Sequence, residues 1–413
     1  MHKALIVILI VIVICLSLSF AMQCMIRRGG IPVNDKANGI VYVWVPFGGY
    51  EFDELLTRDV TEYVIPETYK GKPVKKIGVR AFSGCKQLKS IVINDGIKMI
   101  DSDAFFQCSE LEYVYIGESV EAMRRTAFDE CDKLATVYWN VKEFKNHESV
   151  IFGEKSKVTN AIIGEKVETL TCVFSTCKTI TGINIPVNVK TITSYAFQKC
   201  SGLAEITIPQ TVSEVGIFAF ADCEGLLTAT YGNSFVSHYM FNNRRNLKNV
   251  ILQETVTGIG NCAFGGCESL ESIYIPSKVS NIGKLPFKSC LKLSLIQVSE
   301  DNANYSSKGG FLFDKAKTRL ICVPEGVSGF IGVPEGVTEL GSLALYNCVN
   351  IDSVSIPETL SKIGSNAFHG YSGLTDIYYK GTIEQWNRIE KGENWNIYAN
   401  EFKVHCSDGE IDG

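Results

Sequence analysis

A phrase of the form Ala-Phe-x-x-Cys-x-x-Leu-x-x-Ile-x-Ile recurs along this chain of 413 residues. Most of its copies lie 21 to 24 residues apart, and a near-constant period in this range is typical of a solenoid. One repeat is too small to bury its own apolar face, so each must stack on its neighbours. The period therefore predicts a stack of coils that share one continuous core. The phenylalanine position of the phrase falls at Phe82, Phe105, Phe128, Phe152, Phe174, Phe197, Phe220, Phe241, Phe264, Phe287, Leu345 and Phe368.

Apolar residues within each repeat mark two strands and a turn. Counted from the phenylalanine as zero, positions +9 and +11 are apolar, as in Ile206 and Ile208, which is the spacing of one strand face. Proline often follows at +12, where its missing N–H ends a strand. Positions +15 and +18 predict a second short strand, and Phe, Cys and Leu three residues apart predict a helical turn. We expect a mainly β solenoid of right-handed coils of about 23 residues, each with two short parallel strands and one helical turn.

The remaining segments are expected to interrupt or close this stack. We assign residues 27–78 to an N-terminal segment and cap, 79–380 to the solenoid, and 381–413 to a C-terminal cap and tail. The step of 58 residues from Phe287 to Leu345 holds two repeats and twelve further residues, which predict a projecting β-hairpin near 303–321. Thr382 and Gln385 have the spacing of a capping box, so a short C-terminal capping helix is expected.

The N-terminus has the pattern of an export signal. Met1-His2-Lys3 is followed by an apolar run from Ala4 to Phe20. Residues 1–26 are therefore predicted to be a signal peptide or a membrane anchor, and the run is long enough to leave both possibilities open. The rest of the chain is expected to be extracellular or at the cell surface, either secreted or anchored through residues 4–26.

The repeat phrase, followed by Val-x-x-Ile-Gly, resembles the BspA-like leucine-rich repeat family of bacterial surface proteins. Residues 203–223 match this pattern, and Asn304–Lys308 with Phe311-Leu312-Phe313 are similar to the hairpin insertion of the family. Residues 381–409 are similar to its C-terminal cap in gut Firmicutes. The resemblance implies a leucine-rich repeat fold and extracellular binding or adhesion. The chain departs from the pattern where the cysteine of the phrase is replaced, at Lys155, Arg244, Glu325 and Tyr371.

Little in the sequence indicates catalysis, metal binding or a cofactor. A net charge of -5 without a basic cluster argues against nucleic-acid binding. The five histidines are scattered, and no acidic segment has calcium-loop spacing. We therefore expect no enzymatic activity, no cofactor and no metal site. Nine of the fifteen cysteines share one repeat position, where we expect a column of small buried free thiols: Cys85, Cys108, Cys131, Cys177, Cys200, Cys223, Cys267, Cys290 and Cys348.

The remaining candidate is an outward strand face that binds protein or glycan partners. Positions +8 and +10 point away from the core, and tyrosine there suits recognition because it is large, rigid and amphipathic. Plain β-propensity explains the same residues equally simply. The leading hypothesis is a non-enzymatic exported interaction or adhesion module, and the alternative is a structural or spacer protein of the cell envelope without a discrete ligand. The candidate face comprises Val92, Tyr113, Tyr115, Tyr138, Ile162, Tyr274 and Tyr378.

Overall fold

The computed structural model describes residues 31–45, 48–145, 150–370, 372–399 and 401–413. They form two compact units, one ending at Asn188 and the other beginning at Val189. The predicted signal peptide or anchor at residues 1–26 lies outside the described residues. Within the described ranges, no helix is both long enough and apolar enough to cross a membrane.

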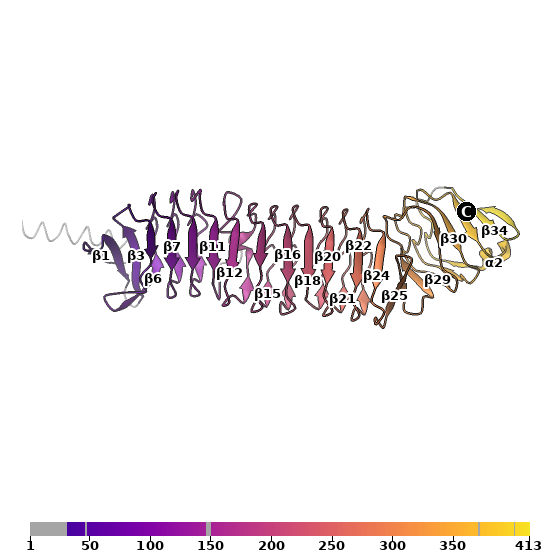
Figure 1. Ribbon diagram of the computed structural model, residues 1–413, viewed down its shortest axis with the longest axis horizontal. Helices are drawn as coiled ribbons and strands as arrows, with labels where there is room; N and C mark the ends of the chain where they lie inside the picture. The colour runs from indigo at the N-terminus through magenta and orange to yellow at the C-terminus, as the bar shows by residue number, and fades with distance from the viewer. Residues whose placement is uncertain (1–30, 46–47, 146–149, 371, 400) are drawn as a thin grey trace, which may run out of the picture. The chain divides into compact units, whose positions relative to one another are not determined.

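The first unit is built on a parallel sheet that receives one strand from each coil (Figure 1). In β9, for example, the inward residues Val114 and Ile116 are fully buried, whereas their outward neighbours Tyr113 and Tyr115 are half-buried. This alternation is the strand period expected from positions +9 and +11. We call this the main sheet of the first unit, and its strands are β4 (Glu62–Val64), β7 (Ser90–Ile93), β9 (Tyr113–Ile116), β11 (Thr136–Trp139), β12 (Asn160–Ile163) and β14 (Gly182–Asn184).

A second sheet lies on the other side of these coils and continues into an N-terminal meander. Short strand β10 pairs in parallel with β8, β8 pairs in parallel with β6, and β6 pairs in parallel with β3. The ring of Phe52 in β3 stacks on Phe82 of the first complete coil at 4.8 Å. The meander therefore covers the core of that coil. The strands are β1 (Ile31–Asp35), β2 (Ile40–Val45), β3 (Gly49–Leu55), β5 (Thr68–Tyr69), β6 (Lys72–Ile77), β8 (Met99–Ile100) and β10 (Ala122–Met123).

The repeating phenylalanines stack on one another inside each unit. Phe82 and Phe105 lie 5.1 Å apart between ring centroids, and Phe264 and Phe287 lie 5.9 Å apart. The residues around each phenylalanine form turns closed by backbone hydrogen bonds between residues three apart. Cys85 N, for example, donates to the Phe82 carbonyl oxygen at 3.1 Å. Among the described residues only Cys172–Phe174 forms a complete 3₁₀ helix. The solenoid of short parallel strands is confirmed, and its expected helical turn is in most coils a run of tight turns.

The second unit repeats this plan with parallel main strands. They are β16 (Glu205–Ile208), β18 (Thr228–Tyr231), β20 (Asn249–Leu252), β22 (Ser272–Ile275), β24 (Leu295–Val298), β28 (Gly329–Gly332), β30 (Ile351–Ile356), β32 (Asp376–Tyr379) and β34 (Lys403–Cys406). The sheet of β28 to β34 ends in β35 (Gly409–Asp412), which pairs antiparallel with β34. The short strands of the second unit are β15 (Thr191–Ile192), β17 (Glu214–Val215), β19 (Phe235–Val236), β21 (Gly258–Ile259), β23 (Asn281–Ile282), β29 (Glu339–Leu340), β31 (Lys362–Ile363) and β33 (Glu390–Lys391).

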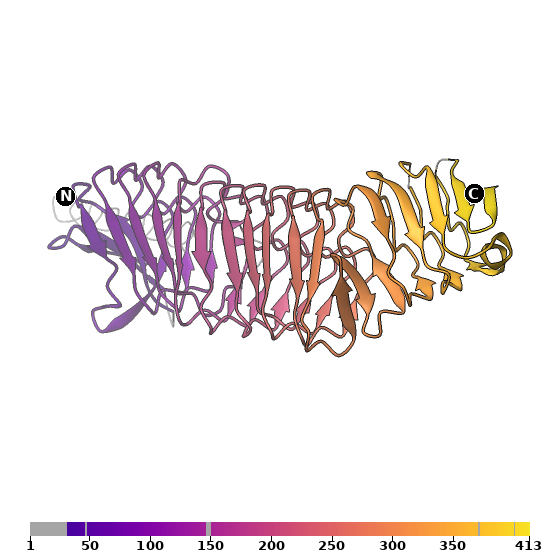
Figure 2. The same ribbon diagram turned by 45° about the vertical axis from the view of Figure 1, so that its right-hand side comes forward.

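An antiparallel insertion interrupts the second unit between β24 and β28. Strands β25 (Tyr305–Lys308), β26 (Phe311–Asp314) and β27 (Arg319–Cys322) pair in sequence, and β27 then pairs in parallel with β29 (Figure 2). The expectation of a projecting hairpin was wrong in one respect. Phe311, Leu312 and Phe313 are buried, because three consecutive large apolar residues cannot remain in solvent without cost. The insertion therefore packs onto the core.

The expected C-terminal capping helix is present as α2 (Ile383–Arg388). The Thr382 hydroxyl accepts from Gln385 N at 3.2 Å, and Thr382 N donates to Gln385 Oε1 at 2.7 Å, which is the capping box. Trp386 is buried against Tyr379, and Trp395 packs edge-on against Phe368 and Phe402. These aromatic residues close the core of the last coil.

Candidate binding face

Four of the sequence-selected residues form one outward column in the first unit. Val92 lies opposite Tyr115, Tyr115 opposite Tyr138, and Tyr138 opposite Ile162 on successive parallel strands. Their backbone positions are in register, so the side chains share one face of the main sheet. Val92 and the two tyrosines are half-buried, and Ile162 is 38% exposed. We call these four residues the outward column.

The two tyrosines of the outward column contact each other directly. Their rings stack with centroids 5.0 Å apart and planes 24° apart. Asn140 Nδ2 donates to the Tyr115 hydroxyl at 3.4 Å. The neighbouring Tyr113 lies at +8 on β9, opposite Ser90 and Thr136. Burial raises the pKa of Tyr113, and the Tyr115 and Tyr138 hydroxyls add to the shift.

Sequence reasoning missed one member of this face. Val64 in β4 lies opposite Val92 and is 58% exposed. It was missed because the first half coil lacks the Ala-Phe-x-x-Cys phrase from which positions were counted. The signal that could have found it is the Val-Ile-Pro sequence at residues 64–66, which matches the end of a repeat strand.

Tyr274 and Tyr378 belong to the second unit and lie on separate sheets within it. Tyr274 in β22 is 44% exposed and lies opposite Gln297. Tyr378 in β32 is 43% exposed and lies between Ser355 and His405. The structure therefore does not bring these two tyrosines together, because β22 and β32 are in different sheets.

Tyr378 instead takes part in an aromatic and charged cluster that sequence reasoning did not identify. Its ring stacks on the His405 imidazole at 4.8 Å and lies 6.3 Å from Phe330, which is 62% exposed. His405 Nε2 lies 2.6 Å from Asp376 Oδ1, and Nδ1 lies 2.9 Å from Glu410 Oε1. The hydrogen bond to Asp376, with a further contribution from Glu410, raises the pKa of His405. The outward position of Phe330 beside the inward Ile331 was the available signal.

A second aromatic strip lies on the turn side of the second unit. Tyr195, Phe218 and Tyr239 each precede a core phenylalanine by two residues and are 43%, 49% and 53% exposed. All three have positive φ angles, near 60°, a conformation that bulky residues rarely adopt. They border a shallow depression of about 290 Å³ that also includes Asp222 and Arg244.

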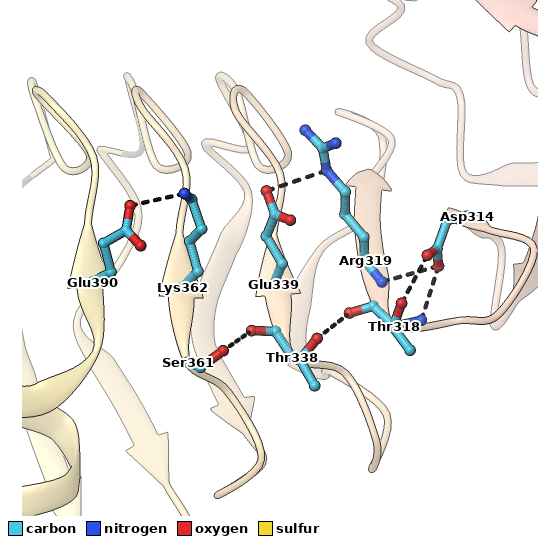
Figure 3. A network of polar contacts seen from close by, with 8 residues as sticks. All are labelled: Asp314, Thr318, Arg319, Thr338, Glu339, Ser361, Lys362 and Glu390. Carbon is cyan, nitrogen blue, oxygen red and sulfur yellow. Dashed lines mark hydrogen bonds and ion pairs between the residues drawn. The ribbon is translucent and has the colours of Figure 1, made fainter.

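Polar contacts link the short strands of the second unit near its insertion (Figure 3). Asp314 accepts from Thr318 N and Oγ1, both at 2.8 Å, and from Arg319 N at 2.9 Å. Thr338 Oγ1 donates to the Thr318 carbonyl oxygen at 3.3 Å. Ion pairs join Arg319 to Glu339 and Lys362 to Glu390. Exposed ion pairs contribute little individually, so we interpret this ladder as support for the strands rather than as a site.

The repeated cysteines line the interior rather than a reactive surface. Thiols of successive coils donate to the carbonyl oxygen of the phenylalanine in the preceding coil, as from Cys108 to Phe82 at 3.2 Å and from Cys290 to Phe264 at 3.1 Å. Burial raises the pKa of Cys85 to about 11 and that of Cys223 to about 12. Across the described part of the chain, no group of three or more His, Cys, Asp or Glu residues is placed to hold a metal ion.

Comparison with known proteins gives a family match over most of the chain. A family model described as "BspA type Leucine rich repeat region (6 copies)" matches residues 50–172, 75–201, 171–294, 234–330 and 328–391. A comparison with curated proteins finds no match.

Several solved structures of bacterial proteins are similar to the chain. A leucine-rich cell surface protein from Faecalibacterium prausnitzii is 22% identical, with 87% of this chain and 97% of that one covered and a TM-score of 0.38. A leucine-rich repeat protein from Bacteroides ovatus is 21% identical, with coverages of 90% and 99% and a TM-score of 0.37. The pneumococcal vaccine antigen PcpA is 16% identical, with coverages of 92% and 88% and a TM-score of 0.35.

Proposed function

Because the chain belongs to the BspA-type leucine-rich repeat family, we propose that it is a non-enzymatic, exported interaction module that binds protein or glycan partners through its outward strand face. The observation that carries the proposal is the outward column. Val92, Tyr115, Tyr138 and Ile162 are adjacent on four strands and partly exposed. A contiguous patch of this kind supplies the large amphipathic side chains that dominate recognition.

The support beneath the outward column suits it to binding. The alternate residues of the same strands, including Val114, Val137 and Trp139, are essentially fully buried. Backbone pairing on both sides holds β9 and β11 in the sheet. A partner would therefore not have to order this surface on binding, which removes one of the usual entropic costs. The phenol hydroxyls can bond to a peptide or a saccharide, so the face is compatible with either class.

Capture followed by a matched comparison tests the proposed face. Immobilised full-length protein is exposed to mucosal and matrix extracts and to a glycan array, and the Tyr115→Ala and Tyr138→Ala variants are treated in parallel. A partner retained by the unchanged protein and lost by both variants supports the outward column. A partner retained equally by all three proteins would move the binding surface elsewhere. Failure to retain any partner at micromolar concentration favours the envelope spacer.

Export is tested separately from binding. The proposal rests on the basic start and the apolar run from Ala4 to Phe20. A reporter that is active only in the cytoplasm, fused after Gly413, is expected to be silent. A fully active reporter would contradict export without bearing on the binding face.

A further inference from the structure

Among the described residues, strand β28 of the second unit pairs with a neighbour on one side only. It pairs in parallel with β30 and is the end strand of its sheet. The main strand of the preceding coils, β24, is engaged by the insertion instead. Ile296 N donates to the Gly310 carbonyl oxygen at 2.9 Å, and Val298 N donates to Ser307 Oγ at 3.1 Å. The insertion thus satisfies β24 and leaves the facing edge of β28 without a strand.

The alternation of the parallel ladder identifies the open backbone groups. Val333 N donates to the Ser355 carbonyl oxygen at 2.9 Å. The backbone N–H and C=O groups of Ile331 and Val333 therefore point toward β30. The N–H and C=O groups of Phe330 and Gly332 must therefore face the opposite side. No described residue outside β30 pairs with these groups. Two donors and two acceptors consequently lie along the free edge at the spacing of a strand.

A cleft lies along this edge. Its volume is about 570 Å³, and it lies between the insertion and β28. Phe311, Val327 and Ile331 supply an apolar lining, and the exposed Lys308 supplies a positive charge. Lys308 forms no ion pair with any described residue. Proteins normally protect an open edge with charges or by covering it. Here the exposed apolar Phe330 lies on the edge strand itself.

We propose that the edge of β28 is a strand-addition site for an extended peptide segment of a partner protein. The peptide backbone pairs with Phe330 and Gly332, alternate apolar side chains enter the cleft toward Ile331, and an acidic side chain reaches Lys308. Only another backbone offers donors and acceptors at the matching period, which is how strand addition gives affinity while side-chain pockets give specificity. This site does not depend on the outward column, which lies in the other unit.

Peptide selection with a backbone-specific variant tests the proposal. A random twelve-residue peptide library displayed on phage is selected on the full-length protein. Recovered peptides are then measured on Gly332→Pro and on Gly332→Ala. Proline removes the N–H of the open edge without removing an internal bond, since edge positions accept proline. Alanine keeps the N–H, and a Cβ built at Gly332 meets no atom within 4 Å. We expect at least a tenfold loss of affinity for the proline variant and none for alanine.

Two further measurements keep the outcome decisive. N-methylation of alternate peptide amides should abolish binding in one register and spare it in the other, even if Gly332→Pro folds poorly. Lys308→Glu should weaken binding of acidic peptides by a similar factor. Peptides that bind Gly332→Pro unchanged, tolerate N-methylation at every position, or are not recovered at all would overturn the proposal. Tyr115→Ala should leave peptide binding unchanged, so failure of this site and failure of the outward column are distinguishable.

Discussion

The guanidinium of Arg244 donates from Nη1 to the backbone carbonyl oxygen of Phe220 at 3.0 Å. In neighbouring coils a cysteine thiol makes the corresponding bond, from Cys223 to Phe197 and from Cys267 to Phe241. Arg244 is only 6% exposed. The position therefore requires a donor for a buried carbonyl oxygen, and arginine meets this requirement where the repeat phrase has lost its cysteine.

Arg244→Ala should destabilise the second unit more than Arg244→Cys. Alanine leaves the Phe220 carbonyl oxygen without its donor, which should cost about 1–3 kcal/mol, whereas cysteine restores the bond used in adjacent coils. Urea unfolding midpoints of the two variants are the measurement. Equal midpoints for alanine and the unchanged protein would show that the carbonyl oxygen has no need of the donor.

The repeated cysteines should remain free and unreactive in the folded protein. Burial raises the pKa of Cys85 to about 11 and of Cys223 to about 12, so little thiolate forms at neutral pH. Alkylation with mass spectrometry under non-reducing conditions should modify the half-buried Cys262 before either of them. All should react after unfolding. Recovery of most column cysteines as disulfide-linked peptides would contradict this prediction.

Tyrosine truncation in the outward column should separate binding from stability. Tyr115→Ala and Tyr138→Ala should each reduce partner affinity by at least about 2 kcal/mol if the face binds. Their loss of stability should be near that of one aromatic pair, about 0.5–1.5 kcal/mol.

The inward Ile116 provides the control for this comparison. It is fully buried on the same strand as Tyr115. Ile116→Ala should therefore cost about 2–5 kcal/mol of stability. Calorimetric melting and titration of the captured partner measure the two effects. If Tyr115→Ala and Ile116→Ala change melting and partner affinity by the same amounts, Tyr115 has no binding role separate from stability.

The stability of the C-terminal hairpin of β34 and β35 should be greatest at a pH set by His405. The raised pKa of His405 means that its stabilising contribution is complete below the ordinary histidine pKa of about 6.5 and is lost as pH rises through the folded value. The hydrogen bond from His405 lowers the pKa of Asp376. The stability contributed by the ionised Asp376 carboxylate is therefore lost as pH falls below the ordinary aspartate pKa of about 3.9. Lys403 Nζ lies 3.7 Å from Glu410 Oε2. Hydrogen exchange across pH should show most protection in weakly acidic solution, and His405→Gln should remove the loss at higher pH.

Asp314 should be needed for the insertion to keep its closing turn. Its carboxylate accepts three hydrogen bonds from Thr318 and Arg319. Asp314→Ala removes all three hydrogen bonds and should increase the amide exchange rate in β26 and β27. Asp314→Asn keeps part of the acceptor capacity, so its exchange rate should lie between those of the unchanged protein and Asp314→Ala. The exchange rate in β9 of the first unit is the internal reference. Unchanged exchange in β26 would show that apolar packing alone holds the insertion.

The repeat phrase was sufficient to predict the coils but not their irregular neighbours. Phe82 and Phe105 stack, and Val114 and Ile116 are buried, because each is fixed by its place in the period. The role of Arg244 could not be read from sequence, since only the three-dimensional position of the Phe220 carbonyl oxygen reveals it. Pairing of β3 with β6 and the open edge of β28 likewise depend on how non-repeating segments pack.

The outward column was predictable as a set of neighbours but not as a site. Val92, Tyr115, Tyr138 and Ile162 are adjacent because their repeat positions are equivalent. Ring stacking of Tyr115 on Tyr138 and the extension to Val64 required coordinates. Phe330 was overlooked because an outward aromatic residue at a single position gives no periodic signal.

Strands β24 and β28 belong to different sheets, and this junction bears on how the second unit unfolds. In a stack where each coil holds only its neighbours, loss of structure spreads until it meets a weak junction. Backbone contact across this junction includes the bond from Gly326 N to the Leu293 carbonyl oxygen at 2.9 Å. Under mechanical load, the coils from β28 to the C-terminal helix should therefore yield as a separate cooperative block. A force–extension trace of the chain should record that block as its own step.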